Sequence, residues 1–240
     1  MITKKTNIAI RIGKYVPDYV KCNNEWNSFR RDYPSIANIY NQNIVNSEGY
    51  LIISTIDREK RATAVALHEK ASDLYNKGNN EASEFTRKNA LKLFIESNDF
   101  YWIGYYHFEC YADLKKHPLA PRMFFMLSAY IQDDSGGMIR YFSDIKDRLE
   151  YTRVQPQRRL LQNESVMILT RASDKGDITA SRLLGKIYFK GIFNREKNYH
   201  LADHYLSHAV AERDYEAYEL SLELAEKMKE NKLFIKLTII

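Results

Sequence analysis

The sequence has few of the residues that disulfide scaffolds, all-β folds and membrane spans require. Its 240 residues include two cysteines, nine glycines and five prolines, and 28% of them are charged. This balance is more typical of a helical protein than of an all-β one. Cys22 and Cys110 are far apart and have no metal-ligand spacing, so we expect each to be a small buried side chain in a reducing compartment.

Long apolar runs are missing as well. No stretch approaches the roughly twenty apolar residues of a membrane helix, and charge and proline interrupt the first residues before a signal peptide could form. The net charge is +5, but acids and bases are interleaved, which favours a solvated surface over one basic face. We therefore expect a cytoplasmic protein with no membrane partner.

The motifs of common enzymes are also absent. The sequence has no phosphate-binding glycine loop, no nucleophile elbow and no metalloprotease helix. The acidic turn at 133–137 lacks the spaced oxygen ligands of a calcium loop. His107 and Cys110 lie close together on one expected helix, where a core pair is favoured over a catalytic pair. We predict a non-enzymatic protein without cofactors, although a site assembled from distant segments would leave no motif.

One stretch of the chain repeats itself. Ala172 and Ala180 are followed by Ala209 and Ala217, and both offsets are 37 residues (172 to 209 and 180 to 217). Repeats of this length are typical of stacked helical hairpins. Small residues, glycines and aromatic residues follow in the order Ala172, Gly176, Ala180, Leu184-Gly185, Tyr188, Gly191, Ala202, Tyr205 and Ala209. This order resembles a Sel-one-like repeat, a relative of the tetratricopeptide repeat.

The resemblance implies an all-α fold, a right-handed superhelix of about five helical hairpins. We place the array at residues 55–232, after a less regular segment at 1–54 and before an apolar tail at 233–240. The likeness is clear only over about 172–222. The second repeat then diverges, with Arg213 in place of glycine, as terminal repeats often do.

The family also implies a function. Its members bind other proteins on a concave surface, and bacterial members include scaffolds and immunity proteins that neutralise a toxin. The resemblance therefore implies an adaptor, regulator or toxin-neutralising inhibitor whose partner is another protein. The apolar tail could pack on the last hairpin, add as a strand to the amino-terminal segment, or dock on a second copy to give a homodimer.

Local patterns suggest the element boundaries. Alternating Ile8, Ile10 and Ile12 predict a short strand with a partner at 49–53, or else an irregular helical lead-in, which we favour because an isolated hairpin is marginal. A capping box at 54–57 predicts a helix start. Pro118 is expected to stop one helix, and Pro121 to start the next.

The most aromatic run, residues 100–111, predicts a helix that is apolar on nearly all sides. Such a helix is normally buried, so its rings would fill the core between hairpins. In the alternative interpretation part of this helix lines a binding groove, because tyrosine and tryptophan supply much of the binding energy of interfaces. In that case the partner-binding residues are Tyr101, Trp102, Tyr105 and Tyr106.

Two other constellations are weaker candidates. His200, His204 and His208 follow at four-residue steps between Glu196 and Glu212 on one expected helix, a spacing at which imidazoles can share a transition metal. An exposed polar stripe explains them better. The segment 140–171 is rich in arginine, and a nucleic-acid-binding function would use Arg153, Arg158 and Arg159 to contact phosphates. Interleaved acids favour a solvated face instead.

Overall fold

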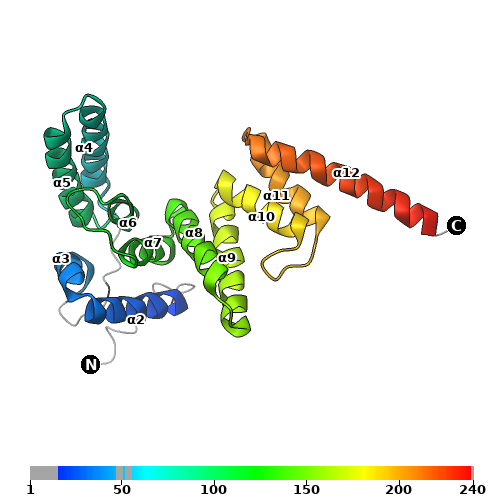
Figure 1. The fold of residues 1–240 in the computed structure, drawn as a ribbon, viewed down its shortest axis with the longest axis horizontal. Helices are drawn as coiled ribbons and strands as arrows, with labels where there is room; N and C mark the ends of the chain where they lie inside the picture. The colour runs from blue at the N-terminus through cyan, green and yellow to red at the C-terminus, as the bar shows by residue number, and fades with distance from the viewer. Residues whose placement is uncertain (1–15, 47–50, 52–55, 239–240) are drawn as a thin grey trace. The chain divides into compact units, whose positions relative to one another are not determined.

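The computed structural model describes residues 16–46, 51 and 56–238. Within these residues the chain forms eleven helices, α2 to α12, and no strand (Figure 1). Val45 and Leu51 form an isolated antiparallel bridge. The prediction of an all-α protein with helices packed in neighbouring pairs is confirmed. The predicted strand at 8–12 lies outside the described residues.

The chain divides into two compact units, Met1–Gly137 and Met138–Ile240. The helices of the first unit are α2 (Val16–Asp32), α3 (Pro34–Ile44), α4 (Arg58–Asn76), α5 (Asn80–Glu96), α6 (Phe100–Glu109) and α7 (Ala120–Ile131). The remaining helices are α8 (Ser135–Tyr151), α9 (Gln155–Asp174), α10 (Ile178–Lys190), α11 (Tyr199–Ala211) and α12 (Tyr215–Thr238). In the first unit α4 packs against α5, and α7 packs against both α6 and α2. In the second unit α10 packs against α9 and α11, and α12 packs against α11.

The same tight turn joins consecutive helices at five places. Each turn has one residue in a left-handed conformation, and the next residue is an aspartate or asparagine that accepts a hydrogen bond from the N–H three positions later. The left-handed residues are Gly78, Asn98, Asp133, Gly176 and Arg213. The capping residues are Asn79, Asp99, Asp134, Asp177 and Asp214. Asparagine and aspartate are preferred caps because their side-chain oxygen satisfies a free N–H at the helix start.

The 37-residue sequence repeat corresponds to a structural repeat in the second unit. All four marker alanines, Ala172, Ala180, Ala209 and Ala217, have no exposed surface. The N–H of Asp177 donates to the carbonyl of Ala172 at 3.1 Å, and the N–H of Asp214 donates to that of Ala209 at 3.1 Å. The left-handed φ is kept as well, although arginine replaces glycine at 213.

A longer loop occurs once in each unit at an offset of 81 residues. Three positions in each loop have positive φ: Cys110, Ala112 and Asp113 after α6, and Gly191, Phe193 and Asn194 after α10. The glycine inside each preceding helix faces the next helix. A Cβ at Gly104 would lie 2.9 Å from the Phe125 ring, and a Cβ at Gly185 would lie 2.5 Å from Leu206 Cγ. The α6–α7 and α10–α11 hairpins therefore have the same loop conformation and the same glycine contact between their helices.

The described part of segment 1–54 forms two helices that contribute to the core of the first unit. Trp26 and Tyr40 are fully buried, and both rings contact Phe124 of α7, at centroid distances of 6.0 and 4.7 Å. The Tyr19 hydroxyl donates to the carbonyl of Leu51 at 2.9 Å. These contacts attach α2 and α3 to the helical hairpins.

Several local predictions need correction. Asp57 is itself the N-cap of α4, accepting from the N–H of Lys60 at 3.1 Å, so it does not occupy the third position of a capping box. Helix α6 ends at Glu109 because Cys110 adopts a left-handed φ of 56°, well before Pro118. Cys110 is exposed, whereas Cys22 is buried as predicted. The backbone of 233–238 continues α12, so this part of the tail is not a strand.

Candidate functional site

Helix α6 presents its aromatic residues on two faces that differ in exposure. Asp99 caps the helix by accepting from the N–H of Trp102 at 3.2 Å, and its carboxylate pairs with Arg61 Nε at 2.9 Å. One face, with Phe100 and Tyr106, is buried. The other face carries Tyr101, Trp102 and Tyr105, which are all partly exposed. The aromatic run therefore serves both the core and the surface.

His68 of α4 lies at the centre of this aromatic surface. Its ring centroid lies 4.8 Å from that of Trp102, 5.9 Å from Tyr105, 5.7 Å from Tyr106 and 6.0 Å from Tyr111. Trp102 also stacks on the buried Phe94 ring of α5, at 5.0 Å with an angle of 8°. We call His68, Phe94, Trp102, Tyr105, Tyr106 and Tyr111 the aromatic cluster.

Two polar groups of the aromatic cluster, the His68 imidazole and the Tyr106 hydroxyl, have pKa values shifted toward the neutral form. Burial raises the pKa of Tyr106 far above its usual range, although the charge of Arg87 opposes the shift. Burial and then the charge of Arg87 lower the pKa of His68. The Tyr106 hydroxyl is hydrogen-bonded to His68 Nδ1 at 3.2 Å. At neutral pH both His68 and Tyr106 are therefore uncharged.

One cation, the guanidinium of Arg87, packs against a ring of the aromatic cluster. The Arg87 guanidinium of α5 lies 3.8 Å from the centroid of the Tyr111 ring and 5.4 Å from that of Tyr75. Arg87 also pairs with Glu84 at 3.8 Å. A cation over an aromatic face is attracted by the ring quadrupole, so Arg87 fixes Tyr111 at the border of the cluster. Three elements, α4, α5 and α6 with its following loop, thus hold the rings in place.

The four predicted partner-binding residues differ in their exposure in the structure. Trp102 and Tyr105 belong to the aromatic cluster and are partly exposed, and Tyr101 lies next to them, 5.7 Å from Trp102 between ring centroids. Tyr106 has no exposed surface, so it supports the cluster from inside. Sequence reasoning missed His68 and Arg87, because each lies on another helix and carries no motif of its own.

The arginines of the nucleic-acid alternative have different environments within the second unit. Arg158 is partly buried and donates to the carbonyls of Leu149 and Thr152, so it caps the end of α8. Arg153 lies in the loop before α9 and Arg159 is the fifth residue of α9, and both are exposed. The three side chains do not converge on one surface feature, since Arg158 is directed to backbone groups.

The histidines of the metal alternative lie on α11 and are exposed. Glu196 precedes this helix and Glu212 follows it, so the array is shorter than predicted. His208 Nδ1 lies 3.1 Å from the Ser181 hydroxyl of α10. Among the residues that the structure describes, no three histidine, cysteine or acidic side chains are grouped closely enough to hold a metal ion.

A second buried polar pair joins α3 to α6. The Tyr40 hydroxyl lies 2.6 Å from His107 Nε2, and the His107 ring stacks on Phe124 at 5.5 Å. Burial, with a smaller effect of the charge of His117, lowers the pKa of His107 to about 4. His107 is 3% exposed, whereas Cys110 is on the surface, so the expected core pair of these two residues is wrong.

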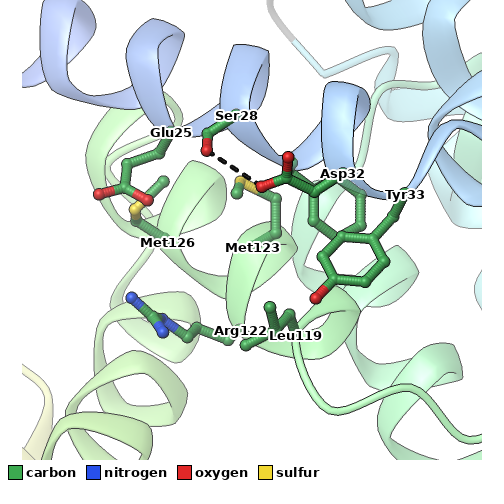
Figure 2. A pocket seen from close by; sticks show the side chains of 9 residues that line it. Glu25, Ser28, Asp32, Tyr33, Leu119, Arg122, Met123 and Met126 are labelled. Atoms are coloured by element: carbon green, nitrogen blue, oxygen red, sulfur yellow. Dashed lines mark hydrogen bonds between the residues drawn. The ribbon is translucent and has the colours of Figure 1, made fainter.

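A small cavity lies between α2 and α7 (Figure 2). It measures about 90 Å³ and is lined on one side by Glu25, Ser28 and Asp32 and on the other by Met123 and Met126. The Ser28 hydroxyl donates to the Asp32 carboxylate at 3.4 Å. Small-molecule pockets usually measure about 300–1,000 Å³, so this cavity has room for a few water molecules at most.

Comparison with known proteins gives no indication of function, so the aromatic cluster is the main evidence for it. No protein-family model, no curated protein and no solved structure matches the chain. No helix within the described part of the chain is long and apolar enough to span a bilayer. The fold and the surface define an all-helical protein of paired helices with one preorganised aromatic surface.

Proposed function

We propose that this chain is a Sel-one-like helical-repeat protein that binds another protein through the aromatic cluster of its first unit. The two hairpins with matching glycines and loops, and the 37-residue repeat of buried alanines, support the family assignment. The family offers a scaffold without catalytic residues, as in adaptors, regulators and toxin-neutralising inhibitors.

The observation that carries the proposal is the packing of Trp102. Its ring contacts both the Phe94 ring and the His68 ring and remains partly exposed. A ring fixed in this way loses little conformational freedom when a partner covers it, which lowers the entropic cost of binding. Tryptophan and tyrosine anchors supply a large part of the binding energy in many interfaces.

The chemistry of the cluster indicates the kind of partner segment. The surface is formed by neutral rings with hydroxyl, indole and imidazole edges, and the Arg87 cation is covered by Tyr111. Such a surface favours an apolar or aromatic side chain flanked by polar backbone groups, as a peptide segment provides. Exposed phosphate-binding cations are not part of it.

The partner should be captured before the site is tested. Tagged full-length protein is used as bait in an extract of cells that express it natively, and one half of the sample is treated with nuclease. A protein captured in stoichiometric amount from both halves would support the proposal. Loss of the captured protein on digestion would contradict it and favour binding through Arg153 and Arg159.

The first prediction concerns binding of the captured protein. Trp102→Ala and Tyr105→Ala are each expected to weaken its affinity at least tenfold, because each removes an anchor of the interface. Isothermal titration calorimetry measures the effect, and circular dichroism checks that the helices are retained. Phe85→Ala is the matched control, since Phe85 is 67% exposed on α5 outside the cluster. Equal affinity of all three variants and the native protein would refute the assignment.

A further inference from the structure

A histidine side chain caps the start of α7. The His117 Nδ1 atom accepts from the backbone N–H of Leu119 at 3.3 Å and from that of Ala120 at 3.0 Å. These N–H groups have no carbonyl partner within α7, because the first N–H groups of a helix precede its hydrogen-bond ladder. Leu119 is the N-cap residue by backbone position, but it makes no side-chain cap. The imidazole therefore supplies the cap that this helix start requires.

The second unit has an asparagine at the equivalent position. At the offset of 81 residues that relates the two longer loops, His117 corresponds to Asn198 and Ala120 to Leu201. The Asn198 side-chain oxygen accepts from the N–H of Leu201 at 3.0 Å and caps α11. Histidine Nδ1 and asparagine Oδ1 are both two bonds from Cβ, so either side chain can place an acceptor at the same point. Of these two caps, however, the histidine is the one that titrates near neutral pH.

Both hydrogen bonds of His117 require the neutral imidazole. A backbone N–H can only donate, so Nδ1 must be the acceptor and the ring proton must be on Nε2. Protonation places a hydrogen on Nδ1 as well, and the ring then has no acceptor left. The added positive charge also lies at a helix start, where the backbone dipoles disfavour it. Protonation of His117 therefore removes the cap of α7.

His117 also joins the start of α7 to the end of α2. Its ring lies edge-on to that of Tyr33, which follows α2, at a centroid distance of 4.6 Å, and to that of Phe29 at 6.0 Å. Tyr33 and Leu119 line the small cavity between the two helices (Figure 2). The two rings would still attract an imidazolium, but an imidazolium cannot accept from the N–H groups of α7. The neutral ring is thus the form that holds both helices.

The folded first unit leaves His117 accessible to protons. The residue is partly exposed, whereas His107 is buried. Burial lowers the pKa of His117 below its usual value, the direction expected for a ring that is held as an acceptor. The charged and titratable groups on the elements around it are Glu25 and Asp32 of α2, Tyr33, His107 of α6, Lys116 of its own loop and Arg122 of α7.

We propose that His117 is a pH-sensitive cap, which holds the start of α7 against the end of α2 at neutral pH and releases it when protonated in mild acid. The release is local, because the buried Trp26 ring of α2 keeps its contact with Phe124 of α7. The second unit keeps its equivalent cap in acid, since Asn198 does not titrate. This device does not depend on the partner-binding function proposed above.

Hydrogen exchange of the full-length protein, followed by NMR, tests the proposal. Protection factors of the Leu119 and Ala120 amides are compared at pH 7 and pH 5, because these factors correct for the intrinsic change of exchange rate with pH. Protection in the native protein should fall about tenfold, within the limit of roughly 25-fold for one group whose exposed pKa is 6.5. Circular dichroism at both pH values checks that the helices are retained.

Two substitutions of His117 separate its protonation from other effects of acid. His117→Asn copies the cap of the second unit, so its loss of protection between pH 7 and pH 5 should be about tenfold smaller than the native loss. His117→Ala removes the acceptor and should show, already at pH 7, the low protection that the native protein reaches at pH 5. Acid effects transmitted through His107 are present in all three proteins and cancel. An equal loss in the native protein and His117→Asn, no loss in the native protein, or native protection in His117→Ala would each overturn the proposal.

Discussion

Among the glycines of the second unit, Gly185 has the least room for a side chain. An added Cβ would lie 2.5 Å from Leu206 Cγ and 3.3 Å from the backbone nitrogen of Leu206. The backbone contact cannot be relieved by a rotamer change, so α10 and α11 would have to separate. Gly104 is equivalent in α6, where the added Cβ would instead meet the side chains of Phe124 and Phe125.

We expect Gly185→Ala to lower the free energy of unfolding by about 1–3 kcal/mol, the usual cost of overpacking. In an exposed helix the same change would stabilise by about 1 kcal/mol, so a net loss identifies the steric contact. Thermal unfolding followed by circular dichroism measures it. Lys186→Ala, on the exposed side of α10, is the control and should change little. An unchanged or higher melting temperature for Gly185→Ala would show that α11 can move away from the added Cβ at little cost in free energy.

Among the elements, the turn between α11 and α12 is the one repeated turn with a long side chain in the left-handed position. Arg213 has a φ of 64°, whereas Gly176 has a φ of 85° in the equivalent turn. The turn nevertheless keeps the hydrogen bond from the Asp214 N–H to the Ala209 carbonyl. The Asp214 carboxylate also still accepts from the N–H of Ala217 as the helix cap. The surrounding packing therefore imposes the left-handed conformation on a residue that does not prefer it.

Arg213→Gly is expected to stabilise the second unit by about 1 kcal/mol, because glycine removes the steric cost of left-handed backbone for an L residue. The gain would appear as a higher midpoint in urea unfolding monitored by circular dichroism. Arg213→Ala removes the same charge and keeps a Cβ, so it should give no comparable gain. Equal effects of both substitutions would assign the change to charge rather than to backbone conformation.

The elements could be predicted from the sequence more fully than the candidate site. Buried alanines repeat in sequence because helices cross closely at them, so Ala172 and Ala209 were recognisable without coordinates. The end of α6 could not be recognised from the sequence, because Cys110 takes a left-handed conformation that only its loop imposes. The aromatic cluster draws His68, Arg87 and Tyr111 from three elements, and no period or motif connects them. Their proximity follows from tertiary packing alone.

At the scale of the molecule, the described histidines differ between the two units. In the first unit His68 and His107 have lowered pKa values because they are buried. In the second unit the three histidines of α11 are exposed. Both tryptophans, Trp26 and Trp102, also belong to the first unit. Tryptophan fluorescence therefore monitors the unit in which protonation of histidine is linked to folding.

Acid is expected to destabilise the first unit through His107. Its pKa falls from 6.5 in an exposed chain to about 4 in the folded state, so the unfolded state takes up the proton first. The stability that neutral His107 contributes is complete above pH 6.5 and is lost as the pH falls toward 4. Between pH 7 and pH 5 this loss should amount to about 2 kcal/mol.

Urea unfolding followed by tryptophan fluorescence at pH 7 and pH 5 measures the loss. His107→Gln is the comparison, because its amide oxygen can still accept from the Tyr40 hydroxyl but does not titrate. The native protein should lose about 2 kcal/mol more than this variant over the interval, and the other acid-sensitive groups, His68 among them, cancel in the difference. The same pH dependence in both proteins would mean that His107 takes up its proton without unfolding, and that the contact between α3 and α6 opens by itself.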